Sequence, residues 1–393
     1  MDDSERDDDA GAAEPGSPGP SRVLMTADSQ GGVWTYALEL ARALCRRGVE
    51  VVLATMGPPL ADYQRAEADA LGVAVHEGDE RLEWMPGPWH EVDHAGEWLL
   101  ALADEVEPDV VHLNGYCHAA LPWRRPVVVV AHSSVWTWWR AVHGVDPPPE
   151  WNEYRRRVIE GLGAADRVVA VSRSLLAALE EAYRPLPQAL VIPGGRDPAA
   201  MRPGQKQPYI FSAGRLWDEA KNLAALERAA PEVPWPIHVA GEAHHQDGRD
   251  VRPRHLSVLG RLPAPELAEW MERAAIFAAP ARYEPFGLAA LEAGLAGCAL
   301  VLGDIPSLRE VWGDAALFVP PEDSDALGAA LRDLVADSAL CAQRARAART
   351  RALTFGPERM AAAYLAIYRE LAAVDAADTG AFRAIREISA STS

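Results

Sequence analysis

Several features that define common classes of protein are missing from this sequence of 393 residues. Its four cysteines stand far apart, without the paired spacing of a disulfide framework, and a reducing cytoplasm fits them best. No apolar run approaches the ~20 residues that cross a bilayer, so stable membrane insertion is not expected. The N-terminus is acidic where a secretory signal would be basic, so no signal peptide is expected.

Positive charge is also scarce in this chain. The formal net charge is −19, which argues against nucleic acid or an anionic membrane surface as the main partner. Only two of the 38 basic residues are lysines, Lys206 and Lys221, so the Lys221-Asn222 pair stands out from an arginine-rich background. Residues 1–21 are acidic, with almost nothing to bury, and we expect them to form a disordered tail.

The rest of the composition is that of a globular protein with room for two domains. Hydrophobic residues make up 49% of the chain and charged residues 24%. Residues 22–193 contain short buried strands that alternate with helical patterns. Such alternation predicts an α/β domain with a parallel, doubly wound sheet. The predicted strands are 23–26, 49–55, 109–113, 127–131 and 167–171, and the predicted helices are 33–47, 92–106 and 150–163.

Polar and glycine residues follow several of these strands where each strand ends. Gly31 and Gly32 form a turn after the first strand, Asn114 follows the third, and His132 follows the fourth. Ligands of a parallel sheet bind beyond the carboxyl ends of its strands, so these residues are expected to share one site. The chain has no G-x-G-x-x-G, so a nicotinamide dinucleotide is not expected there.

A second alternating series follows a linker at residues 194–206, which is rich in proline and glycine. It spans residues 207–355 and predicts a second Rossmann-like domain. Its last part reads as one long helix over 323–350. A further helix is predicted over 356–373, followed by a loose tail over 374–393.

The most informative stretch runs from Arg282 to Ala299. From Leu288 onward it is apolar on every face, which predicts a helix buried on all sides. One carboxylate, Glu292, lies within that helix, and Glu284 lies eight residues earlier, in the loop at its N-terminus. The N-terminus of a helix attracts anions, so the two carboxylates are expected to flank a phosphate site. The alternative for Glu292 is an ion pair with an arginine of the core.

This E-x7-E pattern, with Pro285-Phe286-Gly287-Leu288 inside it, resembles the signature of retaining glycosyltransferases of family 4. The resemblance covers residues 22–372. It implies the GT-B fold, in which two Rossmann-like domains face each other across a cleft and a C-terminal helix crosses back to the N-terminal domain. It also implies that Glu284 contacts the donor sugar and that Glu292 contacts the nucleotide ribose. Phe286, Gly287 and Leu288 would complete this part of the donor site.

The same resemblance extends to residues after other strands of the second domain. Gly214-Arg215, with Lys221 six residues on, is similar to the element whose two cations hold the donor diphosphate. A guanidinium fork and an ammonium group both suit phosphate oxygens. Arg261-Leu262 falls in a loop that borders the nucleobase in the family. The linker departs from the family by carrying Pro-Gly-Gly where Pro-Asn-Gly is commoner.

In the first domain, the resemblance implies that His132 contacts the donor sugar and takes part in catalysis. The alternative is a structural histidine at a strand end. Asn114, Trp136 and Trp138 are candidates for the acceptor side, because aromatic rings stack on sugars, although tryptophans this close together are as often part of a core. Gly31 and Gly32 would let the backbone approach the donor.

The stretch His90-Glu-Val-Asp-His94 matches the H-E-x-x-H zinc motif by its letters. A zinc site needs a third ligand and a catalytic cleft, and neither is evident, so no metal is expected.

The composition fits a cytoplasmic location, and the resemblance implies a hexosyltransferase that needs no cofactor or metal. Its partners would be a nucleotide-diphosphate sugar, with a UDP-sugar as first choice, and a small-molecule or glycan acceptor. His132, Arg215, Lys221 and Glu284 are the predicted catalytic residues. The alternatives are a nucleotide-sugar epimerase, a phosphorylase, or a non-catalytic scaffold that binds nucleotide sugars.

Overall fold

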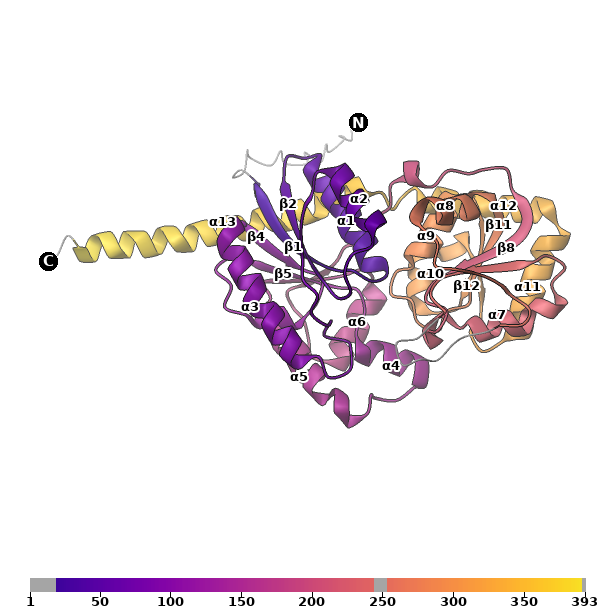
Figure 1. Cartoon of the computed structure of the whole chain (residues 1–393), viewed down its shortest axis with the longest axis horizontal. Helices are drawn as coiled ribbons and strands as arrows, with labels where there is room; N and C mark the ends of the chain where they lie inside the picture. The colour runs from indigo at the N-terminus through magenta and orange to yellow at the C-terminus, as the bar shows by residue number, and fades with distance from the viewer. Residues whose placement is uncertain (1–18, 244–252, 391–393) are drawn as a thin grey trace, which may run out of the picture.

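The computed structural model describes residues 19–243 and 253–390, which form two parallel-sheet domains lying side by side (Figure 1). Of the acidic tail predicted over 1–21, residues 1–18 lie outside the described residues. The first domain ends with a strand at Val191, the second begins with a strand at Gln207, and the segment between them joins the two. The GT-B prediction for the fold is confirmed.

The N-terminal domain has a seven-stranded parallel sheet in the order β3-β2-β1-β4-β5-β6-β7. Its five inner strands are rich in valine and are buried along most of their length, as parallel strands covered by helices must be, while the edge strands β3 and β7 are partly exposed. The strand order reverses between β1 and β4, which opens a crevice beyond Asp28 and Leu113. The strands are β1 (Arg22–Asp28), β2 (Glu50–Met56), β3 (Ala74–Glu77), β4 (Val110–Leu113), β5 (Val127–Ala131), β6 (Arg167–Ala170) and β7 (Ala189–Val191).

Helices cover both faces of this sheet. They are α1 (Gly32–Cys45), α2 (Asp62–Leu71), α3 (Trp89–Val106), α4 (Val135–His143), α5 (Asn152–Ala164) and α6 (Arg173–Ala182), with 3₁₀ turns η1 (Cys117–Ala120), η2 (Pro149–Trp151) and η3 (Pro198–Ala200). Neither α4 nor α6 was predicted, and both begin at a serine. Ser134 and Ser172 each accept a hydrogen bond from the backbone N–H three residues on, which is the cap that starts a helix.

The C-terminal domain has a six-stranded parallel sheet in the order β10-β9-β8-β11-β12-β13. Its strand order reverses between β8 and β11, so a second crevice lies beyond Ala213 and Ala279. The strands are β8 (Gln207–Ala213), β9 (Ile237–Ala240), β10 (Ser257–Gly260), β11 (Ala274–Ala279), β12 (Ala299–Gly303) and β13 (Leu317–Val319). The helices are α7 (Leu223–Ala229), α8 (Ala264–Arg273), α9 (Leu288–Leu295), α10 (Pro306–Trp312), α11 (Ser324–Ala336) and α12 (Ser338–Ala352), with 3₁₀ turns η4 (Glu219–Lys221), η5 (Ala230–Glu232) and η6 (Gly313–Ala315).

Helix α9 is the buried helix that the sequence predicts. All residues from Ala290 to Leu295 are buried, Glu292 included. Gly294 faces the ring of Trp312, and a Cβ atom there would lie 2.8 Å from the ring. The helix therefore packs too closely for any larger side chain at this position, and its N-terminus is fixed at the edge of the sheet.

Helix α13 (Pro357–Ala390) leaves the C-terminal domain and crosses back over the N-terminal one (Figure 1). It carries two tyrosines into the N-terminal core. The hydroxyl of Tyr364 lies 2.5 Å from that of Tyr36 on α1, and the hydroxyl of Tyr368 lies 2.5 Å from Nδ1 of His112 on β4. All four side chains are almost wholly buried. The crossing helix is thus part of the N-terminal core, as the resemblance implied.

Two predictions about the C-terminal third are wrong. The helix predicted over 323–350 is two helices, because Asp337 ends α11 and its carboxylate caps α12 by accepting from the N–H groups of Ala339 and Leu340 at 2.9 Å. The loose tail predicted over 374–393 is helical as far as Ala390. That segment contains several alanines and no proline, so the helix continues through it in spite of Gly380.

We predict that Tyr364→Ala lowers the free energy of unfolding by about 3–5 kcal/mol, because it removes a buried aromatic ring from the joint between α13 and the N-terminal core. Tyr364→Phe, which only leaves the Tyr36 hydroxyl unpaired, should cost about 1–3 kcal/mol. Urea unfolding of the full chain measures both. The exposed Leu353, changed to alanine, is the control, and equal midpoints for Tyr364→Ala and this control would contradict the assignment.

Candidate active site

An ion pair between Lys221 and Glu284 lies at the carboxyl ends of the C-terminal strands. Lys221 Nζ donates to Glu284 Oε2 at 2.6 Å, and the two side chains are 27% and 22% exposed. Lys221 ends η4, and Glu284 lies in the loop between β11 and α9. Both residues line a small pocket with Ser212, Gly287 and Leu308. The structure therefore brings together the cation and the carboxylate that the sequence assigned to the donor site.

The N-terminus of α9 opens into the same pocket. Gly287 precedes the helix with φ 91°, a conformation that favours glycine, and a Cβ atom there would lie 3.2 Å from Leu308. The N–H groups of the first turn have no partner within the helix and present partial positive charge. Gly32, at the start of α1, faces Leu288, and a Cβ atom on Gly32 would lie 3.4 Å from the Leu288 side chain. Gly31 before it has φ 75°. Both glycine turns thus border the same space.

Arg215 is the second cation at this edge of the sheet. Its guanidinium donates to Asp218 Oδ2 at 2.8 Å and lies 5.3 Å from the centre of the Trp217 ring. Burial opposes ionisation of Asp218, but Arg215 and Lys221 outweigh it and hold the pKa of that carboxyl below its usual value. Asp218 stays charged and keeps Arg215 oriented beside the pocket, where 44% of the guanidinium side chain remains exposed.

His132 lies at the carboxyl end of β5 in the N-terminal domain, where its ring packs edge-on against that of Tyr36. Asn114 donates through Nδ2 to the carbonyl of Thr26 at 2.7 Å, which turns its Oδ1 toward His132 Nε2, also at 2.7 Å. That hydrogen bond assigns the ring proton to Nε2 and leaves Nδ1 as an acceptor. Burial lowers the pKa of His132 to about 4, so the ring is neutral at pH 7. Asn114 therefore orients His132, a role that the sequence did not suggest for it.

Asp28, which the sequence placed only in a turn, belongs to the same crevice. It ends β1 and accepts from the N–H of Gln30 at 2.8 Å and from the indole of Trp84 at 3.3 Å. Burial raises the pKa of Asp28 to about 7, against the lowering effects of those bonds and of Arg215 across the cleft. Its place at the switch point of the sheet was the one signal in the sequence that could have identified it.

The two tryptophan candidates for the acceptor side have different surroundings. Trp136 is 3% exposed and packs against Tyr183 and the Arg155 guanidinium, so its ring has no free face for an acceptor. Trp138 is partly exposed, and its indole N–H donates to Asp218 in the other domain at 3.0 Å. Trp138 thus lies in the cleft beside Arg215.

Three further donor candidates, Arg261, Leu262 and Phe286, do not line this pocket. Arg261 is exposed and donates to the hydroxyl of Tyr63 on α2 at 2.8 Å, so it spans the cleft rather than pointing into it. Leu262 is half-buried against the core. Phe286 is buried, with its ring 5.6 Å from that of Phe355 and against Gly194 of the linker. Phe286 therefore fixes the loop that carries Glu284.

Glu292 is held by an arginine, as the alternative prediction proposed. Its Oε1 lies 2.9 Å from Nε of Arg196 in the linker, and that arginine also binds Glu39 of α1. An ion pair with Arg196 and a contact with ribose are compatible, because a carboxylate has more than one acceptor site.

Another polar contact joins the two domains at the start of α6. Glu310 of α10 accepts from the N–H groups of Arg173 and Ser174 at 2.8 and 2.9 Å and from the Ser174 hydroxyl at 2.8 Å. These N–H groups belong to the first turn of α6, so a residue of one domain caps a helix of the other.

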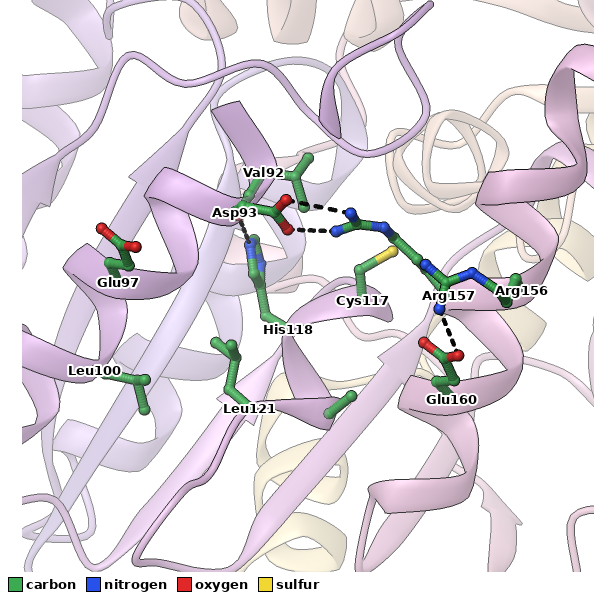
Figure 2. A pocket seen from close by; sticks show the side chains of 11 residues that line it. Val92, Asp93, Glu97, Leu100, Cys117, His118, Leu121, Arg156, Arg157 and Glu160 are labelled. Carbon is green, nitrogen blue, oxygen red and sulfur yellow. Dashed lines mark hydrogen bonds and ion pairs between the residues drawn. The ribbon is translucent and has the colours of Figure 1, made fainter. Parts of the chain in front are cut away.

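The H-E-x-x-H stretch is not part of this site. Helix α3 does run through His90 and His94, but both side chains are exposed, and His94 Nδ1 lies 3.0 Å from Glu80. Asp93 of the same stretch pairs with Arg157 at a cavity of about 320 Å³ that is lined only by residues of the N-terminal domain (Figure 2). Within residues 19–243 and 253–390, no cluster of three His, Cys, Asp or Glu could hold a metal ion.

Comparison with known proteins decides the family. The family model "Glycosyltransferase Family 4" matches residues 30–200, and the model "Glycosyl transferases group 1" matches residues 207–337. A glycogen synthase of Mycobacterium tuberculosis is 30% identical over 82% of this chain and 86% of its own length. The chain belongs to glycosyltransferase family 4. A D-inositol 3-phosphate glycosyltransferase of Xylanimonas cellulosilytica is 27% identical to this glycosyltransferase, over 91% of the chain and 98% of the relative.

Solved structures agree on the fold of this family 4 glycosyltransferase. Sucrose-phosphate synthase from Thermosynechococcus elongatus superposes with a TM-score of 0.75 at 19% identity, over 90% of this chain and all of that one. Anabaena HepE in complex with UDP-glucose superposes with a TM-score of 0.70 at 17% identity, over 88% and 98% of the two chains. Among the described helices, none has the length and apolar character to cross a bilayer.

We predict that Asp28→Asn changes how stability depends on pH. Because the pKa of Asp28 is raised, the folded protein binds this proton more tightly than the unfolded chain, so wild-type stability falls as pH rises through that window. The asparagine variant has no such loss. Its stability relative to wild type should rise by about 1.4 kcal/mol per pH unit between about pH 4 and 7 and then level off. Urea unfolding from pH 5 to 8 measures this, and a difference independent of pH contradicts it.

Proposed function

We propose that this glycosyltransferase moves a sugar from a nucleotide-diphosphate sugar to a hydroxyl of an acceptor, with retention at the anomeric carbon and without a metal ion. The observation that carries the proposal is the pairing of Lys221 with Glu284 at the N-terminus of α9, with Arg215 held nearby by Asp218, whose charge both cations stabilise. Two cations and a helix N-terminus provide what a diphosphate requires.

In this proposal the cations stabilise the departing nucleoside diphosphate. Negative charge grows on the leaving phosphate as the glycosidic bond breaks, and preorganised positive charge lowers the energy of that transition state. Glu284, which holds Lys221 in the absence of a donor, would accept hydrogen bonds from the sugar hydroxyls. Since Lys221 can donate three hydrogen bonds, it can bind phosphate while it keeps Glu284 in place.

The N-terminal domain would supply the other wall of the sugar site. His132 is neutral, and Asn114 fixes its tautomer, so Nδ1 can accept a hydrogen bond from a sugar hydroxyl. By the mechanism usual in this family, the leaving phosphate itself deprotonates the acceptor on the same face of the sugar, which gives retention. The cross-domain contacts of Trp138 and Arg261 would help to exclude water from the closed cleft.

The comparisons suggest which substrates to test first. HepE binds UDP and UDP-glucose in structures that share this fold, so we place a UDP-sugar first among donors. A glycogen synthase and several D-inositol 3-phosphate glycosyltransferases are among the relatives, so a glucan and D-inositol 3-phosphate are the first acceptors to assay. The acceptor would bind on the N-terminal side of the cleft, next to Asp28 and Trp138.

The test measures thermal stability with UDP, GDP, ADP and TDP, each added alone. A ligand that binds only the folded state stabilises it by about 2.7 kcal/mol at a hundredfold excess over Kd. One nucleotide should raise Tm, and Lys221→Met should abolish most of that shift and lower kcat by about 10²–10³-fold. Arg332→Met, which removes an exposed arginine on α11, is the matched control. No shift with any of the four nucleotides contradicts the proposal.

Metal independence gives a separate prediction. Because the two cations and the helix N-terminus supply the positive charge, transfer should continue at an unchanged rate after dialysis against EDTA. The measurement compares the initial rates of dialysed enzyme with and without added Mg²⁺ or Mn²⁺. A loss of activity that either metal restores would show that this part of the proposal is wrong.

A further inference from the structure

Arg196 lies buried between two carboxylates that come from different domains. Its Nη1 lies 2.5 Å from Glu39 Oε1 on α1, and its Nε lies 2.9 Å from Glu292 Oε1 on α9. The side chains of Arg196, Glu39 and Glu292 are 14%, 2% and 9% exposed. A buried charge is costly unless it is paired, so this group is a built feature of the interdomain junction.

The backbone around Arg196 is fixed from two sides. Its N–H donates to the carbonyl of Phe355 at 3.0 Å, and the N–H of Asp197 donates to Glu39 Oε2 at 3.2 Å. Gly195 packs so closely against Gly356 that a Cβ atom would lie 2.9 Å from its backbone. The backbone of Arg196 is therefore fixed between the domains, and this limits where its guanidinium can lie.

The charges of this group do not balance. Two carboxylates share one guanidinium, and Glu67 adds a third negative charge that acts on Arg196. Burial raises the pKa of Glu292; Arg196 opposes that rise, and the nearby charge of Glu39 adds to it. Burial and Glu39 thus oppose the ionisation of Glu292, and Arg196 favours it.

Glu292 also has unused hydrogen-bonding capacity. Its contact with Arg196 Nε is close enough for an ion pair, but that N–H has no hydrogen-bond partner, which indicates poor alignment. Within residues 19–243 and 253–390, Arg196 is the only side chain that pairs with the Glu292 carboxylate, and it does so at Oε1. A buried carboxylate in this state calls for an explanation, and a ligand with hydroxyl donors provides one.

We propose that Arg196 and Glu39 are positioning residues for the nucleotide: Arg196 holds the Glu292 carboxylate where its oxygens accept from the ribose hydroxyls, and Glu39 fixes Arg196. The inference rests on the proposed function and on the ribose contact that the family resemblance implies for Glu292. It means that a residue of the acceptor domain, Glu39 on α1, contributes to donor affinity through two successive ion pairs.

The experiment compares the binding of UDP and 2′-deoxy-UDP by calorimetry. Wild type should bind UDP about tenfold or more tightly than the deoxy analogue, the value of one charge-assisted hydrogen bond. Arg196→Met should bring the ratio of the two Kd values close to one, and Arg196→Lys should give an intermediate ratio because it keeps the charge but loses the fork. A merely structural defect would weaken both nucleotides alike and leave the ratio unchanged.

A second readout is the pH dependence of UDP binding in Glu39→Gln, a variant that keeps Arg196. Protonation of Glu292 should weaken UDP binding as the pH falls. Removing the charge of Glu39 lowers the pKa of Glu292, so the weakening of UDP binding should begin at a lower pH in the variant than in wild type. Arg46→Met is the matched control, because Arg46 pairs with Asp197 and Glu358 and touches neither Glu39 nor Glu292.

The outcomes separate the two proposals. If wild type binds UDP or another of the four nucleotides but the ratio and the pH profile stay unchanged in both variants, the positioning role is wrong and the proposed function stands. If wild type binds no nucleotide, the proposed function fails and the positioning role fails with it.

Discussion

The pair between Lys221 and Glu284 is the contact on which the proposed donor site depends. The chain has 57 acidic residues against 38 basic ones, for a net charge of −19. A cation that binds phosphate must therefore be oriented so that other carboxylates do not pair with it and draw it out of the site. Glu284 and Asp218 each hold one cation at the edge of the pocket, so the positive charge is ordered before any donor arrives. Preorganisation of this kind saves the reorganisation that would otherwise accompany the reaction.

The second constraint is the relation between the two sheets. Each sheet reverses its strand order once, and Trp138 of the N-terminal domain donates to Asp218 of the C-terminal one. Helix α13 anchors its tyrosines in the N-terminal core, while the linker buries Arg196 between α1 and α9. The polypeptide thus passes between the domains twice, and both passages end in buried polar contacts. Such contacts have strict geometric requirements, so they specify one arrangement of the domains more narrowly than apolar packing would.

Much of this could be predicted from the sequence, because it depends on local pattern. Runs such as Val127–Ala131 predict buried parallel strands, and the apolar stretch after Gly287 predicts a buried helix at the site. Signals that depend on one polar side chain were missed, since a capping residue such as Asp337 differs little from any other aspartate on a surface.

Tertiary neighbours account for the remaining errors. Trp136 and Trp138 have the same local context, and only the packing of Tyr183 and Asp218 against them separates core from cleft. The perturbed carboxyl of Asp28 likewise depends on Trp84 and Arg215, which are distant in sequence. Pairing of Arg196 with Glu39 joins residues 157 positions apart, beyond the reach of any spacing rule.

The cap that Glu310 places on α6 has a consequence for how the cleft opens. When the domains separate, the first turn of α6 loses the carboxylate that satisfies its N–H groups, and water must take its place. An N-cap is worth about 1 kcal/mol, so α6 of the N-terminal domain is slightly less stable when the C-terminal domain has moved away from it. Hydrogen exchange at the first amides of α6 would therefore report the fraction of time that the two domains spend apart.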